Sequence, residues 1–340
     1  MSVTINDVAN EAGVSKSTVS KVLNHWTTIS PATVEKVHAA IEKLHYTPNS
    51  RAVSFAKGAT SNIVYLTNLE KDTAYRNPHM FDIMCGVHHT LSENNYSLTL
   101  VNTSEEHYPG EKVSEVITSR SSDGLIIHGS AINKEIANLI LDAGFPHIII
   151  GHPGFESRLC WVDTNHELAG EHAGEYILKH DAFPTFFIGG RKNEFISHER
   201  EKGFRSFLLR HKHRVTSDHV VYTSSTWQEG YEAAMKILSY DSSDASAAGG
   251  NQIPGSIVCE NNTIAVGVSR AIKELGLSVP EDVAFLTFDV YPYSTILDPK
   301  PEVVEINVYD MGVQAGAMIC RKIDNPGLMI QSYITLPEME

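Results

Sequence analysis

Residues 3–24 read VTINDVANEAGVSKSTVSKVLN, and this stretch decides how the N-terminal part of the chain folds. Thr4 can cap a first helix over residues 5–12, where apolar residues recur at helical spacing. Gly13 then permits the left-handed backbone that ends a helix. Ser15 can cap a second helix, which is apolar along one side and small, polar or basic elsewhere. Two short helices joined by a glycine turn predict a helix-turn-helix, whose second helix suits the major groove of DNA.

A helix-turn-helix pattern alone also fits an ordinary pair of surface helices, but the following residues favour a DNA-binding headpiece. Ser30-Pro31 is a cap followed by proline, which starts a third helix. An apolar stripe over residues 34–44 would pack this helix on the other two. Pro48 then breaks the helix, and Asn49 can cap a short new one. The sequence therefore predicts a three-helix headpiece followed by a short hinge helix.

Three segments, TINDVANEAGVSKSTVSKVLN, ISPATVEKV and LHYTPN, resemble the headpiece of the lactose-repressor/galactose-repressor family of bacterial transcription regulators. The resemblance is dense over about the first 60 residues and sparser beyond them. In that family the headpiece reads the major groove and the hinge helix reads the minor groove. The resemblance therefore implies DNA contacts from Thr4, Ser15, Lys16, Ser17, Thr18, Ser20, Lys21, Asn24, Tyr46, Asn49, Ala52 and Phe55.

The hinge departs from the family pattern at two positions. The family's A-R-x-L reads A-V-S-F here, from Ala52 to Phe55. The leucine that usually wedges into the minor groove is thus replaced by Phe55, which is an accepted but larger wedge. The missing arginine removes one phosphate contact.

The charge of the chain is divided unevenly. Residues 1–58 hold six lysines and arginines against four acids, a net charge of +2. The net charge of the whole chain is −14, so residues 59–340 together carry −16. An acidic body repels phosphate and limits non-specific DNA binding, and a headpiece of +2 predicts modest affinity per copy. Two headpieces on one dimer would compensate through effective concentration.

Beyond Ser61 the pattern becomes that of an α/β protein. Short apolar runs alternate with amphipathic helical stretches, which predicts parallel sheets covered on both faces. The predicted strands are IVYL (63–66), LTLV (98–101), GLIIH (124–128), HIII (147–150), TFFIG (185–189), VVY (220–222), SIVC (256–259), VAFLTF (283–288) and IQSYITL (330–336). The predicted helices lie around residues 81–93, 111–119, 134–143, 167–179, 199–209, 227–238 and 264–275.

At 340 residues the chain is too long for one comfortable core, and we predict three parts. They are a helix-turn-helix headpiece (1–47), a hinge helix and linker (48–60), and an effector-binding and dimerisation body (61–340). The expected fold class is an all-α headpiece plus an α/β two-lobed, periplasmic-binding-protein-like body with two parallel doubly wound sheets. We assign about 61–162 plus 291–324 to the first lobe, and 163–290 plus 325–340 to the second.

The resemblance continues in the body and implies a ligand site between the lobes. The matching segments are NPHMFDIMCG (77–86), EREKGF (199–204), GYEAA (230–234) and residues 261–289. Guanidinium donors on Arg200 and carboxylate acceptors on Asp289 would suit the vicinal hydroxyls of a sugar. The alternative for this pair is a structural ion pair or a capping role. The implied effector site comprises His79, Met80, His152, Arg200, Trp227, Asn261 and Asp289.

Departures from the family at this site concern the identity of the effector rather than the place of the pocket. His79 and Met80 stand where many members have two aromatic residues, and Gly151-His152 stands where many have aspartate and another residue. Trp227 lies two residues later than a family pocket aromatic. The effector is expected to be a small carbohydrate or a related metabolite.

Other functional classes have weaker support. Seventeen histidines suggest an enzyme, but the sequence contains no H-E-x-x-H, G-x-S-x-G or P-loop motif. A transport binding protein would share the fold of the body, but it would have a signal peptide and no headpiece. The four cysteines are far apart, which favours reduced buried thiols over a metal site or disulfides. We expect no metal and no cofactor.

We therefore expect a cytoplasmic, nucleoid-associated homodimer that binds a pseudo-palindromic DNA operator and represses transcription. No apolar run is long enough to span a membrane, and the N-terminus lacks a secretion signal. The chain has no C-terminal leucine heptad, which favours a dimer over a tetramer. Effector binding would change lobe closure and hence operator affinity. The alternatives are enzymatic turnover of the ligand, or a nucleoside or other metabolite acting as co-repressor.

Overall fold

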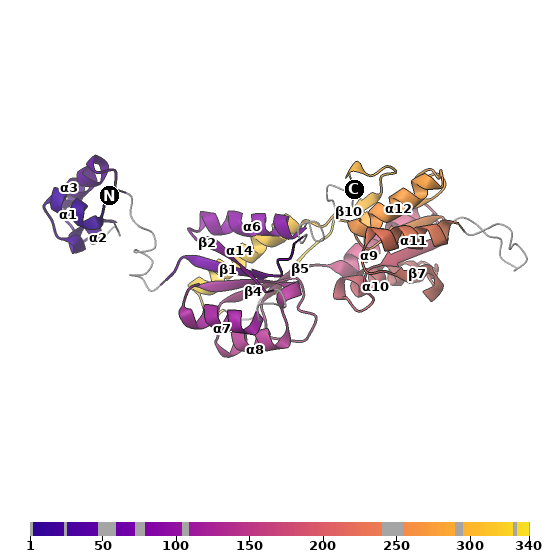
Figure 1. Ribbon diagram of the computed structural model, residues 1–340, viewed down its shortest axis with the longest axis horizontal. Coiled ribbons are helices and arrows are strands. Elements are labelled where there is room, and N and C mark those ends of the chain that lie inside the picture. The colour runs from indigo at the N-terminus through magenta and orange to yellow at the C-terminus, as the bar shows by residue number, and fades with distance from the viewer. Residues whose placement is uncertain are drawn as a thin grey trace, which may run out of the picture. The chain divides into compact units, whose positions relative to one another are not determined.

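The computed structural model describes residues 3–23, 26–46, 59–71, 79–103, 109–239, 254–289, 295–328 and 332–339. The chain falls into two compact units, Met1–Ser61 and Asn62–Glu340 (Figure 1). The predicted fold class, a helix-turn-helix followed by two parallel α/β lobes, is confirmed. Within the residues described, no helix is both long and apolar enough to cross a membrane.

The first unit contains three helices, α1 (Ile5–Ala12), α2 (Lys16–Leu23) and α3 (Pro31–Lys43). The backbone N–H and the hydroxyl of Thr4 donate to Asp7 Oδ2 over 2.8 and 2.7 Å, which fixes the start of α1. Gly13 ends α1 with φ 66°, a left-handed conformation that glycine adopts at little cost. The Ser15 hydroxyl accepts from the backbone N–H of Thr18 over 3.1 Å and caps α2.

The apolar faces of these helices form one small core. Its buried members are Val8, Ala9, Val19, Val22, Val37 and Ala40. Tyr46, just after α3, is half-buried and packs against the same cluster. The three helices are thereby fixed relative to one another, and α2 keeps its polar face outside.

The second unit holds two sheets, each with all its strand pairs parallel. The described part of the first sheet has the order β11-β5-β4-β3-β1-β2, and that of the second has the order β10-β9-β8-β6-β7. The strands of the first are β1 (Asn62–Thr67), β2 (Ser97–Asn102), β3 (Gly124–His128), β4 (His147–Ile150), β5 (Trp161–Thr164) and β11 (Ser332–Thr335). The strands of the second are β6 (Thr185–Gly189), β7 (Val220–Tyr222), β8 (Ser256–Cys259), β9 (Ala284–Phe288) and β10 (Glu302–Val304).

Helices cover both faces of each sheet, because the central strands are apolar on both sides. On the first sheet, α6 (His79–Glu93) and α14 (Val308–Asp324) share one core, while α7 (Pro109–Ser119) and α8 (Lys134–Asp142) border the other, as Figure 1 shows. On the second sheet, α9 (His166–Lys179) and α10 (Phe195–Arg210) pack on one face. The opposite face carries α11 (Trp227–Leu238) and α12 (Asn262–Glu274).

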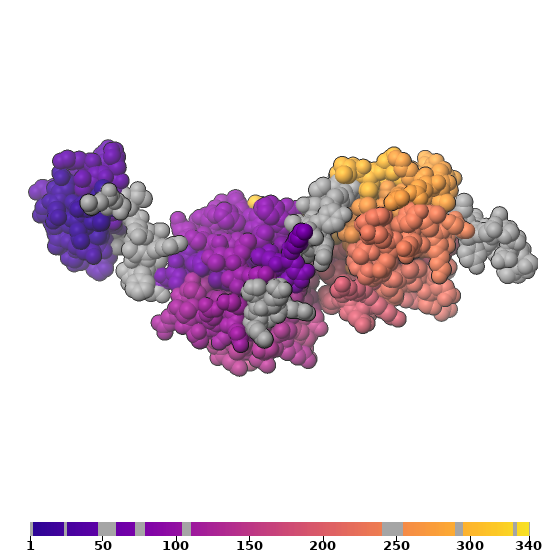
Figure 2. All heavy atoms as spheres, viewed as in Figure 1, coloured from indigo at the N-terminus to yellow at the C-terminus, as the bar shows by residue number. Residues whose placement is uncertain are grey.

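The predicted lobe boundaries near the C-terminus are wrong. Strand β10, placed in the first lobe by the sequence, pairs with β9 in the second sheet, and β11, placed in the second lobe, pairs with β5 in the first. Figure 2 shows gold atoms near residue 300 beside the orange atoms of α12, in agreement with the 2.8 Å bond from Ser269 Oγ to Pro299 O. The chain crosses between lobes after β5, after β10 and again after β11, where Met339 packs on the core of the second lobe. The sequence misassigned β10 and β11 because the partner of a short strand is set by packing rather than by its own sequence.

Candidate functional site

The first candidate surface is the outer face of α2. Lys16, Ser17 and Lys21 are exposed, whereas Thr18 and Ser20 are half-buried. The Lys21 ammonium lies 5.6 Å from the ring centroid of Trp26, whose side chain is 56% exposed. This face combines two cations with hydroxyls that can donate and accept, which is the chemistry that phosphates and base edges bind.

Three other predicted contacts in the headpiece have structural roles as well. Thr4 and Ser15 cap helices, and the Ser15 hydroxyl also lies 2.8 Å from the hydroxyls of Ser17 and Thr18. Tyr46 contributes part of its ring to the core. The predicted contacts of Asn24, Asn49, Ala52 and Phe55 lie outside the described residues.

The second candidate site lies where β8 and β9 end. Arg200, on α10, is 4% exposed, and its Nη1 donates to Glu260 O over 2.6 Å. The same nitrogen lies 3.5 Å from Asp289 Oδ2, and the guanidinium carbon lies 4.6 Å from the ring centroid of Phe288. Asp289 has φ 74°, which turns the chain directly after β9. The two predicted ligands therefore meet at the carboxyl end of the second sheet, the usual place for a ligand in a parallel sheet.

A carboxylate–imidazole pair extends this site. Asp163 Oδ1, on β5, lies 3.2 Å from His166 Nε2, and Oδ2 accepts from the backbone N–H of His152 over 2.8 Å. Burial raises the pKa of Asp163, but the hydrogen bonds and the charge of His166 outweigh it, so the pKa lies below its ordinary value of 3.8. His166 Nδ1 in turn lies 3.4 Å from Arg200 Nε. Asp163 is thus connected to Arg200 through one histidine.

Contacts also join the two lobes at this site. His79 Nε2, at the start of α6, lies 3.6 Å from Asp289 Oδ2. The ring of His152 stacks on that of Phe195 with centroids 4.4 Å apart and an interplanar angle of 14°. Trp161 meets the edge of the same histidine at 5.0 Å. The site therefore combines ion-pairing groups with an aromatic surface, as small-molecule sites in proteins do.

Three predicted effector residues serve other purposes in this structure. The Asn261 Oδ1 accepts from Ile264 N over 3.0 Å and caps α12. Met80 is 5% exposed and belongs to the buried apolar residues of the first lobe. Trp227 is half-buried at the start of α11, and Arg270 lies 5.6 Å from its ring centroid. In this structure, these three side chains cap a helix or pack against their neighbours.

The sequence interpretation missed several residues at the site, namely Asp163, His166, Phe195, Ser197 and Glu260. Glu260 is 4% exposed, and its Oε2 accepts from the backbone N–H of Gly190 and the hydroxyl of Ser197. For Glu260 the available signal was its place directly after a predicted strand, because strand ends of a parallel sheet share one edge. Asp163 had no such signal, since β5, which carries it, was not among the predicted strands.

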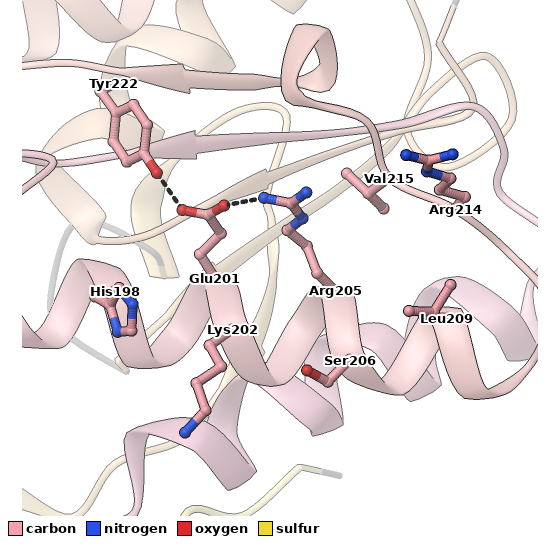
Figure 3. Close-up of a pocket in the computed structure, with 9 residues that line it drawn as sticks. All are labelled: His198, Glu201, Lys202, Arg205, Ser206, Leu209, Arg214, Val215 and Tyr222. Atoms are coloured by element: carbon pink, nitrogen blue, oxygen red, sulfur yellow. Dashed lines mark hydrogen bonds and ion pairs between the residues drawn. The ribbon is translucent and has the colours of Figure 1, made fainter.

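A separate groove of about 520 Å³ lies on the outer side of α10 (Figure 3). At its centre the Glu201 carboxylate accepts from the Tyr222 hydroxyl and from Arg205 Nη1, the latter over 2.7 Å. Burial and the bond to Glu201 raise the pKa of Tyr222 to about 12. Its lining residues are His198, Glu201, Lys202, Arg205, Ser206, Leu209, Arg214, Val215 and Tyr222. None of them is among the predicted effector residues.

Two protein-family models match this chain, one in the headpiece and one in the C-terminal half. Residues 4–49 match the family described as bacterial regulatory proteins, lacI family, and residues 178–338 match the periplasmic binding protein-like domain.

Curated relatives extend over nearly the whole chain. The HTH-type transcriptional regulator MalR of Streptococcus pneumoniae is 28% identical over 316 residues, which cover 92% of this chain and 90% of the relative. The ribose operon repressor of Escherichia coli is 26% identical, covering 98% and 97%. Catabolite control protein A of Staphylococcus epidermidis is 24% identical, covering 98% of each.

Solved structures share the fold. The Lac repressor dimer bound to operator and the anti-inducer ONPF aligns with a TM-score of 0.78 at 20% identity, covering 100% of this chain and 98% of that one. The transcriptional regulator CelR–cellobiose complex aligns with a TM-score of 0.70 at 22% identity, covering 99% and 98%.

Proposed function

The chain belongs to the lacI family of bacterial regulatory proteins, and we propose that it represses transcription from an operator whose affinity is switched by a small carbohydrate. The exposed Lys16, Ser17 and Lys21 on α2 carry the first half of this proposal. In a helix-turn-helix the second helix places such side chains against base edges, while cations beside them hold phosphates. The site of action would be the bacterial nucleoid.

The buried Arg200–Asp289 pair supports the second half. Each hydroxyl of a sugar both donates and accepts, so neighbouring guanidinium and carboxylate groups can hold two hydroxyls at once. Phe195, stacked on His152 and 37% exposed, offers an apolar ring for a sugar face. A nucleoside acting as co-repressor is the alternative, since its base could stack on the same ring.

A homodimer is proposed because one headpiece of charge +2 offers few phosphate contacts. Two aromatic side chains support a partner surface on the first lobe, where α6 and α14 pack together. Phe81 is 59% exposed and Tyr309 is 43% exposed. Exposed aromatic residues on one face are typical of interfaces. Sedimentation of the wild type and of Phe81→Ser would test this surface.

The hinge proposal concerns residues outside the structure's described ranges and rests on the sequence alone. A hinge helix of about eight residues is too short to be stable in water, so operator DNA and the partner's hinge would supply the ordering energy. Phe55 would then wedge into the minor groove and bend the operator.

Operator selection followed by ligand screening tests the whole proposal. Purified protein would first enrich binding sites from a random DNA library, and a pseudo-palindromic consensus is expected. A panel of sugars and nucleosides would then be screened by thermal shift, because a ligand that binds only the folded state raises the melting temperature. A ligand that shifts the melting temperature must also change operator affinity. Mass spectrometry of that ligand would detect turnover, which would favour the enzyme alternative.

A further inference from the structure

Glu260 forms one wall of the site together with Arg200 and Asp289. It follows β8 directly, and its backbone oxygen accepts from Arg200 Nη1 over 2.6 Å. Its Oε2 accepts from Gly190 N–H and Ser197 O–H. Both contacts are donors, so the side chain acts as an acceptor, the role of an ionised carboxylate. Across the described residues, no hydrogen bond reaches Oε1.

The wall holds more negative than positive charge. Glu260 and Asp289 contribute two carboxylates, and the one lysine or arginine that contacts them among the described residues is Arg200. Asp163, reached from Arg200 through His166, adds a third carboxylate. Three carboxylates thus lie around a single guanidinium at this site.

The same wall also contains a hydrogen-bond acceptor that is not used, on Asn262. Asn262 is 3% exposed, and its Nδ2 donates to the backbone oxygen of Asp289 over 2.9 Å. Its Oδ1 is buried and has no hydrogen-bond partner among the described residues. A buried acceptor without a donor is costly, and a ligand hydroxyl or ammonium would satisfy it. A carboxylate or phosphate on the ligand would bring further acceptors and like charge instead.

We propose that Glu260 determines the charge specificity of this site, which admits neutral and amino sugars and excludes uronates and sugar phosphates. This inference rests on the proposed effector function of the site and names the ligand class more narrowly. Glu260 could also serve solely to brace Gly190 and Ser197. The two roles differ in one measurable property, because bracing affects all ligands alike whereas charge selection changes their order.

The experiment uses sugar triplets that differ in one group. Glucose, glucosamine and glucuronate, with the galactose and mannose counterparts, would be titrated into full-length protein at pH 7.5 and followed by thermal shift and calorimetry. In at least one triplet, the amino sugar should bind at least as tightly as the neutral sugar. The uronate of that triplet should bind at least tenfold more weakly than the neutral sugar. Glu260→Gln keeps an acceptor for Gly190 and Ser197 but removes the charge. In this variant, the ratio of the uronate's dissociation constant to that of the neutral sugar should fall about tenfold.

Glu199→Gln is the matched control, because Glu199 precedes Arg200 on α10 but pairs with Lys202 and His198. It should leave the order of ligands unchanged. A wild-type preference for the uronate would overturn the proposal, and so would an unchanged order in Glu260→Gln. If that variant fails to fold, the order in the wild type still decides. If no sugar of any triplet binds, the inference fails, while operator binding by the same protein tells whether the regulatory function stands.

Discussion

His79 Nε2 lies 3.6 Å from Asp289 Oδ2, and this contact joins the first residue of α6 in one lobe to the residue that follows β9 in the other. The same carboxylate oxygen lies 3.5 Å from Arg200 Nη1. Asp289 thus contacts groups from both lobes. An effector bound at Asp289, as we propose, would share or displace the His79 contact and would thereby couple effector binding to the arrangement of the lobes.

Asp289→Asn should separate effector response from operator binding. Asparagine tolerates the left-handed backbone at this position, where φ is 74°, so the fold should persist. Loss of the charge should weaken effector binding by ~1.5–3 kcal/mol, measured by calorimetry with the ligand found by screening. Operator affinity without effector should stay near that of the wild type.

The control for this variant is Asp298→Asn, which removes an exposed carboxylate that pairs with Lys273. It should change neither measurement. A parallel loss of effector and operator binding in Asp289→Asn would make Asp289 a structural residue, and an unchanged effector response would remove it from the site.

Gly203→Ala should strongly destabilise the second lobe. A Cβ at this position would lie 1.9 Å from the backbone oxygen of Glu167, where α9 and α10 cross. Because backbone cannot move aside cheaply, we expect a loss of about 1–3 kcal/mol or more in the free energy of unfolding, measured by urea denaturation. Gly327→Ala is the comparison, since its nearest neighbour is Asn325 Oδ1 at an ordinary 3.5 Å. Equal stability of the two variants would contradict the crossing geometry.

Most elements were predictable because their sequence patterns are local. The strands TFFIG (185–189) and GLIIH (124–128) and the helix at 227–238 have the predicted bounds. Their apolar runs and caps identify each element without its neighbours. The sheet to which β10 or β11 belongs was not predictable, because a short strand of mixed polarity fits either sheet and three-dimensional packing decides.

The candidate site was predictable in part, and for a similar reason. Arg200 and Asp289 were found through a family resemblance, and the structure brings them within 3.5 Å. Glu260 was missed because its significance depends on Gly190 and Ser197, which are 70 and 63 residues away in sequence. Asn261 caps α12 through its Oδ1, and its contact with the effector stays a prediction. An asparagine before a helix fits both roles, so its place in the sequence does not choose between them.

His128 should make the body less stable in mild acid. Burial lowers the pKa of His128 from 6.5 to about 4, although the charge of Asp163 opposes this. The unfolded chain therefore binds a proton that the folded chain does not, between those two pH values. The free energy of unfolding should fall as pH drops from 6.5 towards 4, by up to ~3 kcal/mol from this residue.

His128→Asn isolates that contribution. The asparagine oxygen can replace Nδ1, which accepts from Ser130 N–H over 3.2 Å. Urea unfolding at several pH values should give a shallower acid slope for this variant than for the wild type. Identical slopes for the two proteins would show that His128 is not held neutral by the fold.

Ser17 and Lys21 should read bases, and their substitutions should relax operator specificity rather than weaken binding uniformly. Both side chains are exposed on α2, the helix whose polar face suits the major groove, whereas Val19 and Val22 fix its other face in the core. Removing one base contact should cost ~1–3 kcal/mol of discrimination at one position of each half-site. Selection from a random operator library would measure this, with Lys36→Ala as control because Lys36 is exposed on α3 and should not alter the consensus. If Ser17→Ala and Lys21→Ala both return the wild-type consensus, α2 contacts only phosphates, and base readout must come from other residues of the headpiece or the hinge.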